Sequence, residues 1–279
     1  MGFFEKPNLY IRNVTLNVMN IEKSLAFYTD FLGFKVLENK GKEVVLTTNG
    51  KTALITLIQP AGVTPKERNR TGLYHFAILL PTRADLGKML VHLAKHRYPI
   101  GASDHEVSEA LYLNDPDGNG IEIYCDRPAD QWHWKMDSVN MTSAQLDAES
   151  VMAEAKGEPW EGMPRETVMG HIHLHVSNLA EAANFYQGVL GYDLVLNYGG
   201  QALFLSTGKY HHHLGMNTWN GVGIPAPSEN SAGMKEYAID VPDEAYLQKI
   251  KAALQNDYVE KDGVVYVTDP SGTTISLHV

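Results

Sequence analysis

The chain of 279 residues repeats itself, and this repeat constrains the fold more than any other feature of the sequence. The segment NVTLNVMNIEKSLAFYTDFLGF (13–34) matches HIHLHVSNLAEAANFYQGVLGY (171–192) at an offset of 158 residues without a gap. Each copy reads as a strand, a turn at an asparagine and an amphipathic helix that ends at Gly33 or Gly191, where a left-handed C-cap is expected. Self-similarity at a fixed spacing is typical of a modular fold.

A second, looser repeat alternates with the first. HFAILLPTRADLGKMLVHL (75–93) parallels EYAIDVPDEAYLQKIKAAL (236–254), and a hairpin with DPDG or DPSG at its turn follows each segment. The sequence therefore predicts an α+β protein of four βαβββ modules. We expect two half-barrels, each closed around a ligand by two modules, with the helices outside. The predicted modules are residues 9–60, 72–126, 169–219 and 233–279.

Residues 127–168 interrupt this pattern. They predict a linker between a first pair of modules in 1–126 and a second pair in 169–279. Within the linker, Thr142 and Gln145 form the capping box of a short predicted helix, and Gly157 ends it. The linker either drapes over a neighbouring pocket or is a surface connector in which tryptophans dock for stability.

Composition excludes several classes of partner. A formal net charge of −10 argues against nucleic acid and anionic membranes, since both require a basic patch. A single cysteine, Cys125, excludes an internal disulfide and fits an intracellular protein. No apolar run approaches the roughly 20 residues of a membrane helix, and the first residues lack an apolar signal core. We expect a cytoplasmic protein, and the sequence leaves homo-oligomerisation open.

Three histidines alternate along one predicted first strand. His171, His173 and His175 share one face of that strand because side chains alternate between the two faces. The apolar residues between them are expected to pack on the helix, which leaves the histidines on the open face. Three imidazoles are a poor core filling, so this face is a candidate site.

Two motifs carry a resemblance to a known family. FYTDFLGF and FYQGVLGY are similar to the helix signature of the vicinal oxygen chelate superfamily, and DPDGNGIEIY is similar to its last-strand signature. The superfamily includes glyoxalases, bleomycin and fosfomycin resistance proteins and extradiol dioxygenases. TGLYHFAILLP and SEALYLNDPDGNGIEIY resemble the bacterial catechol-2,3-dioxygenase group. The resemblance implies a metal on the open face, held by the first residue of first strands and a carboxylate on a last strand.

The resemblance then selects one set of ligands. Pairing the second and third modules brings together His75, Glu122 and His171, which is two histidines and one carboxylate. Such a set leaves open positions on iron(II) for substrate and dioxygen. The other pairings lack at least one ligand at the matching positions, which hold Asn13, Glu236 and Ser276. We therefore expect the second and third modules to share an iron(II) site, with manganese, nickel or zinc as alternatives, and the other two to have a structural role.

The resemblance also implies the reaction, an extradiol cleavage of a catechol-type diol by dioxygen. Tyr112 stands ten residues before Glu122 in a predicted hairpin, so it is expected opposite Glu122 on the same face. By resemblance Tyr112 is a catalytic and substrate-binding residue, and His105 matches a catalytic histidine in the loop before that strand. His173 is expected to contact substrate.

The resemblance places the acid–base histidine in YHHHLGMN. The resemblance selects His212, whereas strand parity would place His211 and His213 together on one face, so the sequence leaves open which of the three faces the site.

Two other functions compete with the dioxygenase. A glyoxalase-like isomerase or lyase usually needs two carboxylates at the metal, and the predicted site offers only Glu122. A non-catalytic small-molecule-binding resistance protein often lacks the metal ligands, which this chain has. Metal analysis separates the binding protein from both enzymes.

Overall fold

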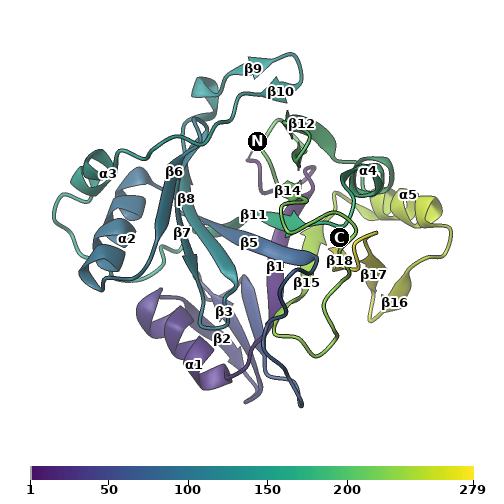
Figure 1. Cartoon of the computed structure of the whole chain (residues 1–279), viewed down its shortest axis with the longest axis horizontal. Coiled ribbons are helices and arrows are strands. Elements are labelled where there is room, and N and C mark those ends of the chain that lie inside the picture. The colour runs from purple at the N-terminus through teal and green to yellow at the C-terminus, as the bar shows by residue number, and fades with distance from the viewer. Residues whose placement is uncertain (1) are drawn as a thin grey trace.

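The computed structural model describes residues 2–279 and contains two curved eight-stranded sheets with helices on their outer sides (Figure 1). The βαβββ module recurs four times, which confirms the predicted α+β architecture of two half-barrels. A short two-stranded ribbon lies outside both sheets. No helix among residues 2–279 is long and apolar enough to span a bilayer.

The first two modules have the same order of elements. The first module consists of β1 (Tyr10–Asn17), α1 (Ile21–Ala26) with a π-helical turn (Phe27–Phe31), β2 (Lys35–Asn39), β3 (Glu43–Thr47) and β4 (Ile55–Ile58). The second consists of β5 (Gly72–Leu79), α2 (Arg83–Lys95), β6 (Gly101–Asp104), β7 (Ser108–Asn114) and β8 (Gly120–Asp126). Gly33 closes the first helix with a φ of 90°, a left-handed conformation that glycine adopts without steric cost.

The last two modules repeat this order. The third consists of β11 (Val168–His175), α4 (Leu179–Ala183) with a π-helical turn (Asn184–Val189), β12 (Asp193–Tyr198), β13 (Ala202–Ser206) and β14 (Leu214–Asn217). The fourth consists of β15 (Gly233–Asp240), α5 (Glu244–Leu254), β16 (Val259–Lys261), β17 (Val264–Thr268) and β18 (Thr274–His278). Gly191 has a φ of 87°, so both predicted glycine caps are confirmed.

Each sheet combines strands from both halves of the chain. One sheet has the order β12-β13-β14-β11-β5-β8-β7-β6, and the other β16-β17-β18-β15-β1-β4-β3-β2. Antiparallel pairing of β11 with β5 joins the second and third modules, and antiparallel pairing of β1 with β15 joins the first and fourth. The division into 1–126 and 169–279 therefore describes the order along the chain, and neither half forms a sheet of eight strands by itself.

Alternation within the first strands sets the two faces of each sheet. In β11, Ile172, Leu174 and the following Val176 are fully buried in the main hydrophobic core, as the sequence predicts. Burying an aliphatic side chain of this size stabilises the fold by about 1.5–3 kcal/mol. The intervening His171 and His173 are also buried, but they lie on the other face.

The helix of the linker begins later than predicted. The helix α3 spans Ala148–Glu154, and the side chain of Asp147 caps it by accepting from the backbone N–H of Ser150 at 3.0 Å. The expected capping box at Thr142 is wrong because this part of the chain is extended: Ala144 forms a β-bridge with Asp104. Before it lie a 3-10 turn (Ala129–Gln131), β9 (Trp134–Lys135) and β10 (Ser138–Val139).

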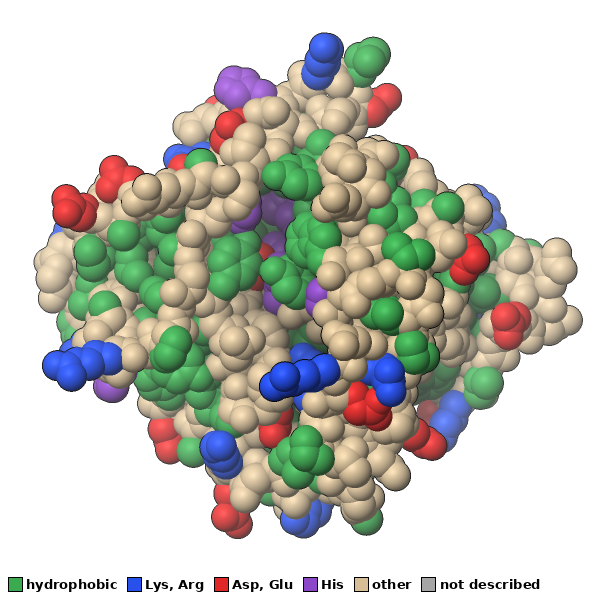
Figure 2. All heavy atoms as spheres, in the orientation of Figure 1, with side chains coloured by type: hydrophobic (Ala, Val, Ile, Leu, Met, Phe, Trp, Pro, Cys, Tyr) green, Lys and Arg blue, Asp and Glu red, His purple; other side chains and the backbone are tan. Residues whose placement is uncertain are grey.

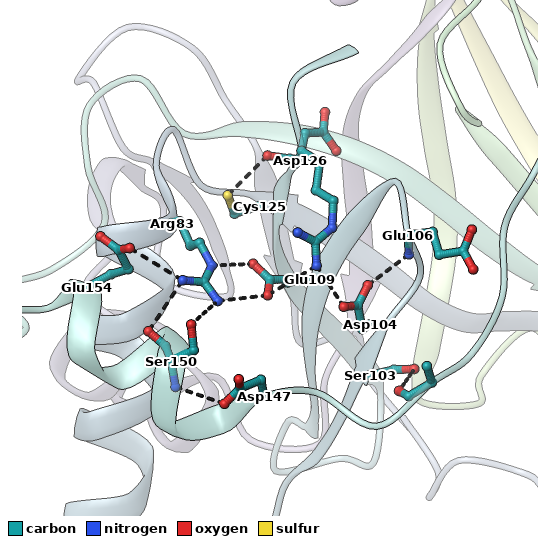
Figure 3. A network of polar contacts seen from close by, with 12 residues as sticks. Arg83, Ser103, Asp104, Glu106, Glu109, Cys125, Asp126, Asp147, Ser150 and Glu154 are labelled. Atoms are coloured by element: carbon teal, nitrogen blue, oxygen red, sulfur yellow. Dashed lines mark hydrogen bonds and ion pairs between the residues drawn. The ribbon is translucent and has the colours of Figure 1, made fainter. Parts of the chain in front are cut away.

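A buried ion-pair network fixes α3 to the second module (Figure 3). Glu109 on β7 is buried and accepts two hydrogen bonds from Arg83 on α2, at 2.5 Å and 3.0 Å. Arg83 also donates to the backbone carbonyl and the hydroxyl of Ser150 on α3. Arg127 lies 3.4 Å from Glu109 and 2.7 Å from Asp104. One arginine therefore joins α2, β7 and α3.

Replacing Arg83 with methionine is expected to lower the free energy of unfolding by about 3 kcal/mol, because removing one partner leaves a buried charge poorly compensated. Urea denaturation measures this loss. Arg68→Met, at an exposed position, serves as the matched control. A loss below about 1 kcal/mol for Arg83→Met would show that Arg127 alone compensates Glu109.

Candidate metal centre

Three adjacent strands bring the predicted ligands together. His75 lies on β5, Glu122 on β8 and His171 on β11, and β5 is the middle strand of the three. Ala77 pairs with His171 on one side and with Glu122 on the other, so its methyl group is the only side chain between them in that row. The small residue at this point leaves room for two longer side chains to approach one another.

The ligand atoms converge. Oε2 of Glu122 lies 3.0 Å from Nε2 of His75 and 3.1 Å from Nε2 of His171. One potential ligand atom from each residue lies within 4.8 Å of the other two, and all three side chains are buried. Within residues 2–279, this is the one place where three such side chains meet in this way.

The protonation states suit a cation. Burial raises the pKa of Glu122, but the neighbouring histidines outweigh burial and hold that pKa well below its usual value. Burial lowers the pKa of His171 to about 4, against the opposing effect of Glu122. At neutral pH the site therefore presents a carboxylate and a neutral imidazole at these two positions, the forms that bind metals.

An unsatisfied donor set supports the same conclusion. Nε2 of His75 is buried and, although Oε2 of Glu122 lies 3.0 Å away, it forms no well-aligned hydrogen bond within residues 2–279. Buried polar atoms without partners are rare in folded proteins and point to an ion or another missing group. The residues therefore fit a divalent metal such as iron(II), since two imidazoles and one carboxylate leave further positions open for other ligands.

A cavity of about 370 Å³ opens beside these ligands, and His75 and Glu122 form part of its lining. Its volume is within the range of small-molecule sites. Aromatic and aliphatic side chains form much of its wall, among them Tyr74, Phe204 and Trp219, and no lysine or arginine lines it. Figure 2 shows histidine side chains recessed in a hollow that hydrophobic side chains surround. An apolar wall over a polar floor suits a flat, neutral ring with polar groups at one end.

Tyr112 and His105 form a pair on one wall of this cavity. Tyr112 on β7 pairs directly with Glu122 on β8, so the predicted position opposite Glu122 is confirmed. The hydroxyl of Tyr112 lies 2.6 Å from Nε2 of His105, and Nδ1 of His105 lies 2.6 Å from the carbonyl oxygen of Thr142. A carbonyl only accepts, so Nδ1 donates, and in neutral His105 Nε2 accepts from Tyr112.

The linker thus reaches the cavity. Met141, Thr142 and Ser143 line it, which agrees with the alternative in which the linker drapes over a pocket. Burial raises the pKa of Tyr112 well above its usual value, and the nearby Glu122 carboxylate raises it further. Tyr112 therefore keeps its proton at neutral pH and acts as a hydrogen-bond donor.

The three consecutive histidines before β14 point in different directions. His212 lines the cavity, with its ring centroid 4.1 Å from that of His171. Nε2 of His211 lies 2.8 Å from Asp126, and Nε2 of His213 lies 3.1 Å from the carbonyl oxygen of Phe3. Of the three residues that the sequence leaves open, His212 is the one that lines the cavity.

His173 lies beside the predicted ligands and is not one of them. Its Nε2 lies 3.0 Å from Nδ2 of Asn217, and its ring lines the cavity. Gly215 makes room for this ring, because a Cβ atom there would lie 2.8 Å from it. Nδ1 of His175 donates to Oδ1 of the same asparagine, and His175 does not line the cavity.

Sequence reasoning missed two residues near the site. Asp126 stands four residues after Glu122 on β8, so the period of two places both on one face, and this signal was available in the sequence. The carbonyl of Thr142 gave no such signal, because any residue could supply it.

Comparisons with known proteins agree with this geometry. Residues 10–123 and 168–277 match the Glyoxalase/Bleomycin resistance protein/Dioxygenase superfamily. The chain is 46% identical over 275 residues to a protein from Bacillus subtilis (strain 168) named Catechol-2,3-dioxygenase, and the match covers 96% of each chain. It is 35% identical over 103 residues to Biphenyl-2,3-diol 1,2-dioxygenase 3 of Rhodococcus globerulus, covering 36% of this chain and 54% of that protein.

Solved structures share the fold. Glyoxalase I from Zea mays superposes with a TM-score of 0.59 at 17% identity, covering 96% of this chain and 92% of that one. An identity this low supports the fold alone, whereas the match to the Bacillus protein extends over nearly the full length. The chain therefore belongs to the Glyoxalase/Bleomycin resistance protein/Dioxygenase superfamily and, within it, to the dioxygenase oxidoreductases.

Proposed function

We propose that the protein is a metal-dependent extradiol dioxygenase that opens the ring of a catechol-type substrate beside its diol, with dioxygen as the second substrate. The convergence of His75, Glu122 and His171 beside a cavity of aromatic character carries this proposal. The names of the two relatives, which act on catechol and on a biphenyl diol by their wording, support the substrate class.

The proposed metal is iron(II), held by His75, Glu122 and His171. When bound, it would supply a chelation point for the two diol oxygens and the redox chemistry that dioxygen requires. Manganese(II), nickel(II) and zinc(II) also bind imidazole and carboxylate donors, so elemental analysis of the protein as isolated tests the choice.

The protein residues then divide the work of orientation and proton transfer. His212 is proposed as the acid–base group, because it lines the cavity beside His171. Burial lowers the pKa of His212 well below its usual value, so at neutral pH it is an unprotonated base. The hydroxyl of Tyr112, whose proton is directed to His105, is proposed to accept a hydrogen bond from a hydroxyl group of the substrate. His173 is proposed to contact the ring from the β11 side.

The residues that line the cavity disfavour a glyoxalase-like reaction. Among residues 2–279, Glu122 is the only carboxylate that lines the cavity, and it is also a proposed ligand. No second carboxylate is available there to move a proton between carbon atoms, so ring cleavage is the reaction that the donor set supports best.

Aerobic assay of the iron(II)-loaded protein with catechols tests the function. We expect a yellow ring-opened semialdehyde, followed by its visible absorbance, and incorporation of both atoms of isotopically labelled dioxygen, followed by mass spectrometry. A protein that holds iron at full occupancy and cleaves none of a varied panel of catechols would contradict the proposal.

The lining predicts discrimination against charged rings. A catechol that carries a carboxylate would lose hydration without gaining a lysine or arginine partner in the cavity, whereas a methyl group of similar position would contact the apolar wall. We expect the Kd of the carboxylated catechol to exceed that of methyl-substituted catechol by at least about 10-fold. Anaerobic titration followed by tryptophan fluorescence measures both, since Trp219 lines the cavity. Equal Kd values for the two catechols would show that the carboxylate of the bound catechol remains in contact with water, and would contradict this prediction.

A further inference from the structure

We infer that Asp126 and His211 are positioning residues that fix the tautomer of His212 and leave its Nε2 free to accept a proton from the cavity. This inference rests on the proposed function for the role of His212. It concerns a chain of three side chains behind the cavity wall, which runs from β8 to the loop before β14.

The geometry of the chain is continuous. Oδ1 of Asp126 lies 2.8 Å from Nε2 of His211, and Nδ1 of His211 lies 2.8 Å from Nδ1 of His212. His211 is fully buried, and His212 is nearly so. Of these three side chains only His212 lines the cavity, so Asp126 and His211 do not contact the substrate space.

The donor and acceptor roles follow from Asp126. An ionised carboxylate only accepts hydrogen bonds, so Nε2 of His211 carries the proton. With His211 neutral, its one N–H is at Nε2, so Nδ1 of His211 is an acceptor and the hydrogen between the two rings belongs to Nδ1 of His212. The remaining nitrogen of His212, Nε2, then bears a lone pair and has no hydrogen-bond partner in the protein within residues 2–279.

The hydrogen bonds from Asp126 through His211 hold His212 in one tautomer. A histidine whose ring can flip, or whose proton can move to the other nitrogen, would present a donor to the cavity for part of the time. A carboxylate that acts through a hydrogen-bonded partner holds the reacting nitrogen in one state, as it does in catalytic triads. Here a second imidazole carries that effect from Asp126 to His212.

Tyr210 supplies an internal control. Its hydroxyl lies 3.3 Å from Oδ1 of Asp126 and 2.7 Å from the hydroxyl of Tyr124. It therefore contacts the same carboxylate without being a member of the chain to His212. Tyr210→Phe removes a hydrogen bond from Asp126 and leaves the two histidine contacts in place.

Nitrogen-15 NMR of histidine-labelled full-length protein, with zinc in place of iron, tests the tautomer directly. We expect the wild-type His212 signals, assigned by their loss in His212→Phe, to show a proton on Nδ1 and none on Nε2. The same signals in Asp126→Asn are expected to show a mixture of both tautomers, because an amide can donate as well as accept, and those of Tyr210→Phe to match the wild type. A wild-type His212 with its proton on Nε2 overturns the inference, whatever the variants do.

Kinetics provides the second measurement. Asp126→Asn is expected to lower kcat by about 10- to 100-fold, the usual cost of losing an outer partner, with KM for catechol changed less than about threefold. Tyr210→Phe is expected to keep kcat near that of the wild type. Equal kcat for Asp126→Asn and wild type overturns the positioning role. A wild type that cleaves no catechol overturns the proposed function instead, and the NMR result still decides the tautomer.

Discussion

Replacing Glu122 with glutamine is expected to lower the affinity for a divalent metal by more than about 100-fold. Losing an outer partner of a ligand typically costs about 10- to 100-fold, so losing the anionic ligand itself should cost more. Glu122 contributes the only negative charge at the site, and its oxygen lies within 3.1 Å of both histidines. Glutamine keeps the shape of the side chain and removes that charge. Ring cleavage, if it depends on this metal, should fall with occupancy.

Anaerobic calorimetric titration with iron(II) measures the affinity, and a thermal melt of the metal-free protein checks that the variant folds. Glu166→Gln is the matched control, because Glu166 is exposed and lies outside the site. Wild-type affinity in a folded Glu122→Gln variant would exclude Glu122 as a ligand.

Acidification is expected to destabilise the metal-free protein, and His213 offers a way to measure part of the effect. Burial lowers the pKa of His213 from 6.5 to about 3, against the opposing effect of the hydrogen bond that His213 donates to the carbonyl of Phe3. Below pH 6.5 the unfolded chain binds a proton there and the folded chain does not, so stability is lost as pH falls from about 6.5 towards about 3. The slope is about 1.4 kcal/mol per pH unit, or about 2 kcal/mol between pH 6.5 and 5.

Urea denaturation at several pH values compares the wild type with His213→Gln, which keeps a donor for the carbonyl of Phe3 and does not titrate. The wild type is expected to lose about 2 kcal/mol more than the variant over that range. His133→Gln, at an exposed position, should follow the wild type. Parallel stability curves for wild type and His213→Gln would mean that His213 is protonated in the folded protein.

The repeat made much of the fold predictable. Module boundaries, the glycine caps and the alternation in β11 all depend on residues close in sequence, so their patterns are visible in a single chain. The choice of the second and third modules for the site came from ligand types, because only that pairing brought His75 and His171 to one carboxylate. The start of α3 was missed because Ala144 pairs with Asp104, a contact from outside the local sequence that overrides the capping pattern.

The site was predictable where it lies on paired strands. A hairpin fixes which residues face one another, so the position of Tyr112 opposite Glu122 followed from the turn. The directions of His211, His212 and His213 did not follow, because these residues lie in a loop before β14, where no regular period assigns side chains to faces. His211 and His213 are oriented by distant partners, Asp126 and the carbonyl of Phe3, and His212 contacts His211.

The pairing of the first module with the fourth in one sheet has a consequence for biosynthesis. β1 ends at Asn17, yet its antiparallel neighbour β15 begins at Gly233, so most of the polypeptide must leave the ribosome before the two can meet. At about 5–20 residues per second this delay is roughly 10 to 45 seconds. During that interval one edge of β1 lacks its neighbour, and unpaired strand edges invite wrong pairing between chains. The last strand of the histidine-bearing sheet, β14, ends at Asn217, so that sheet can close before the sheet that contains the first strand.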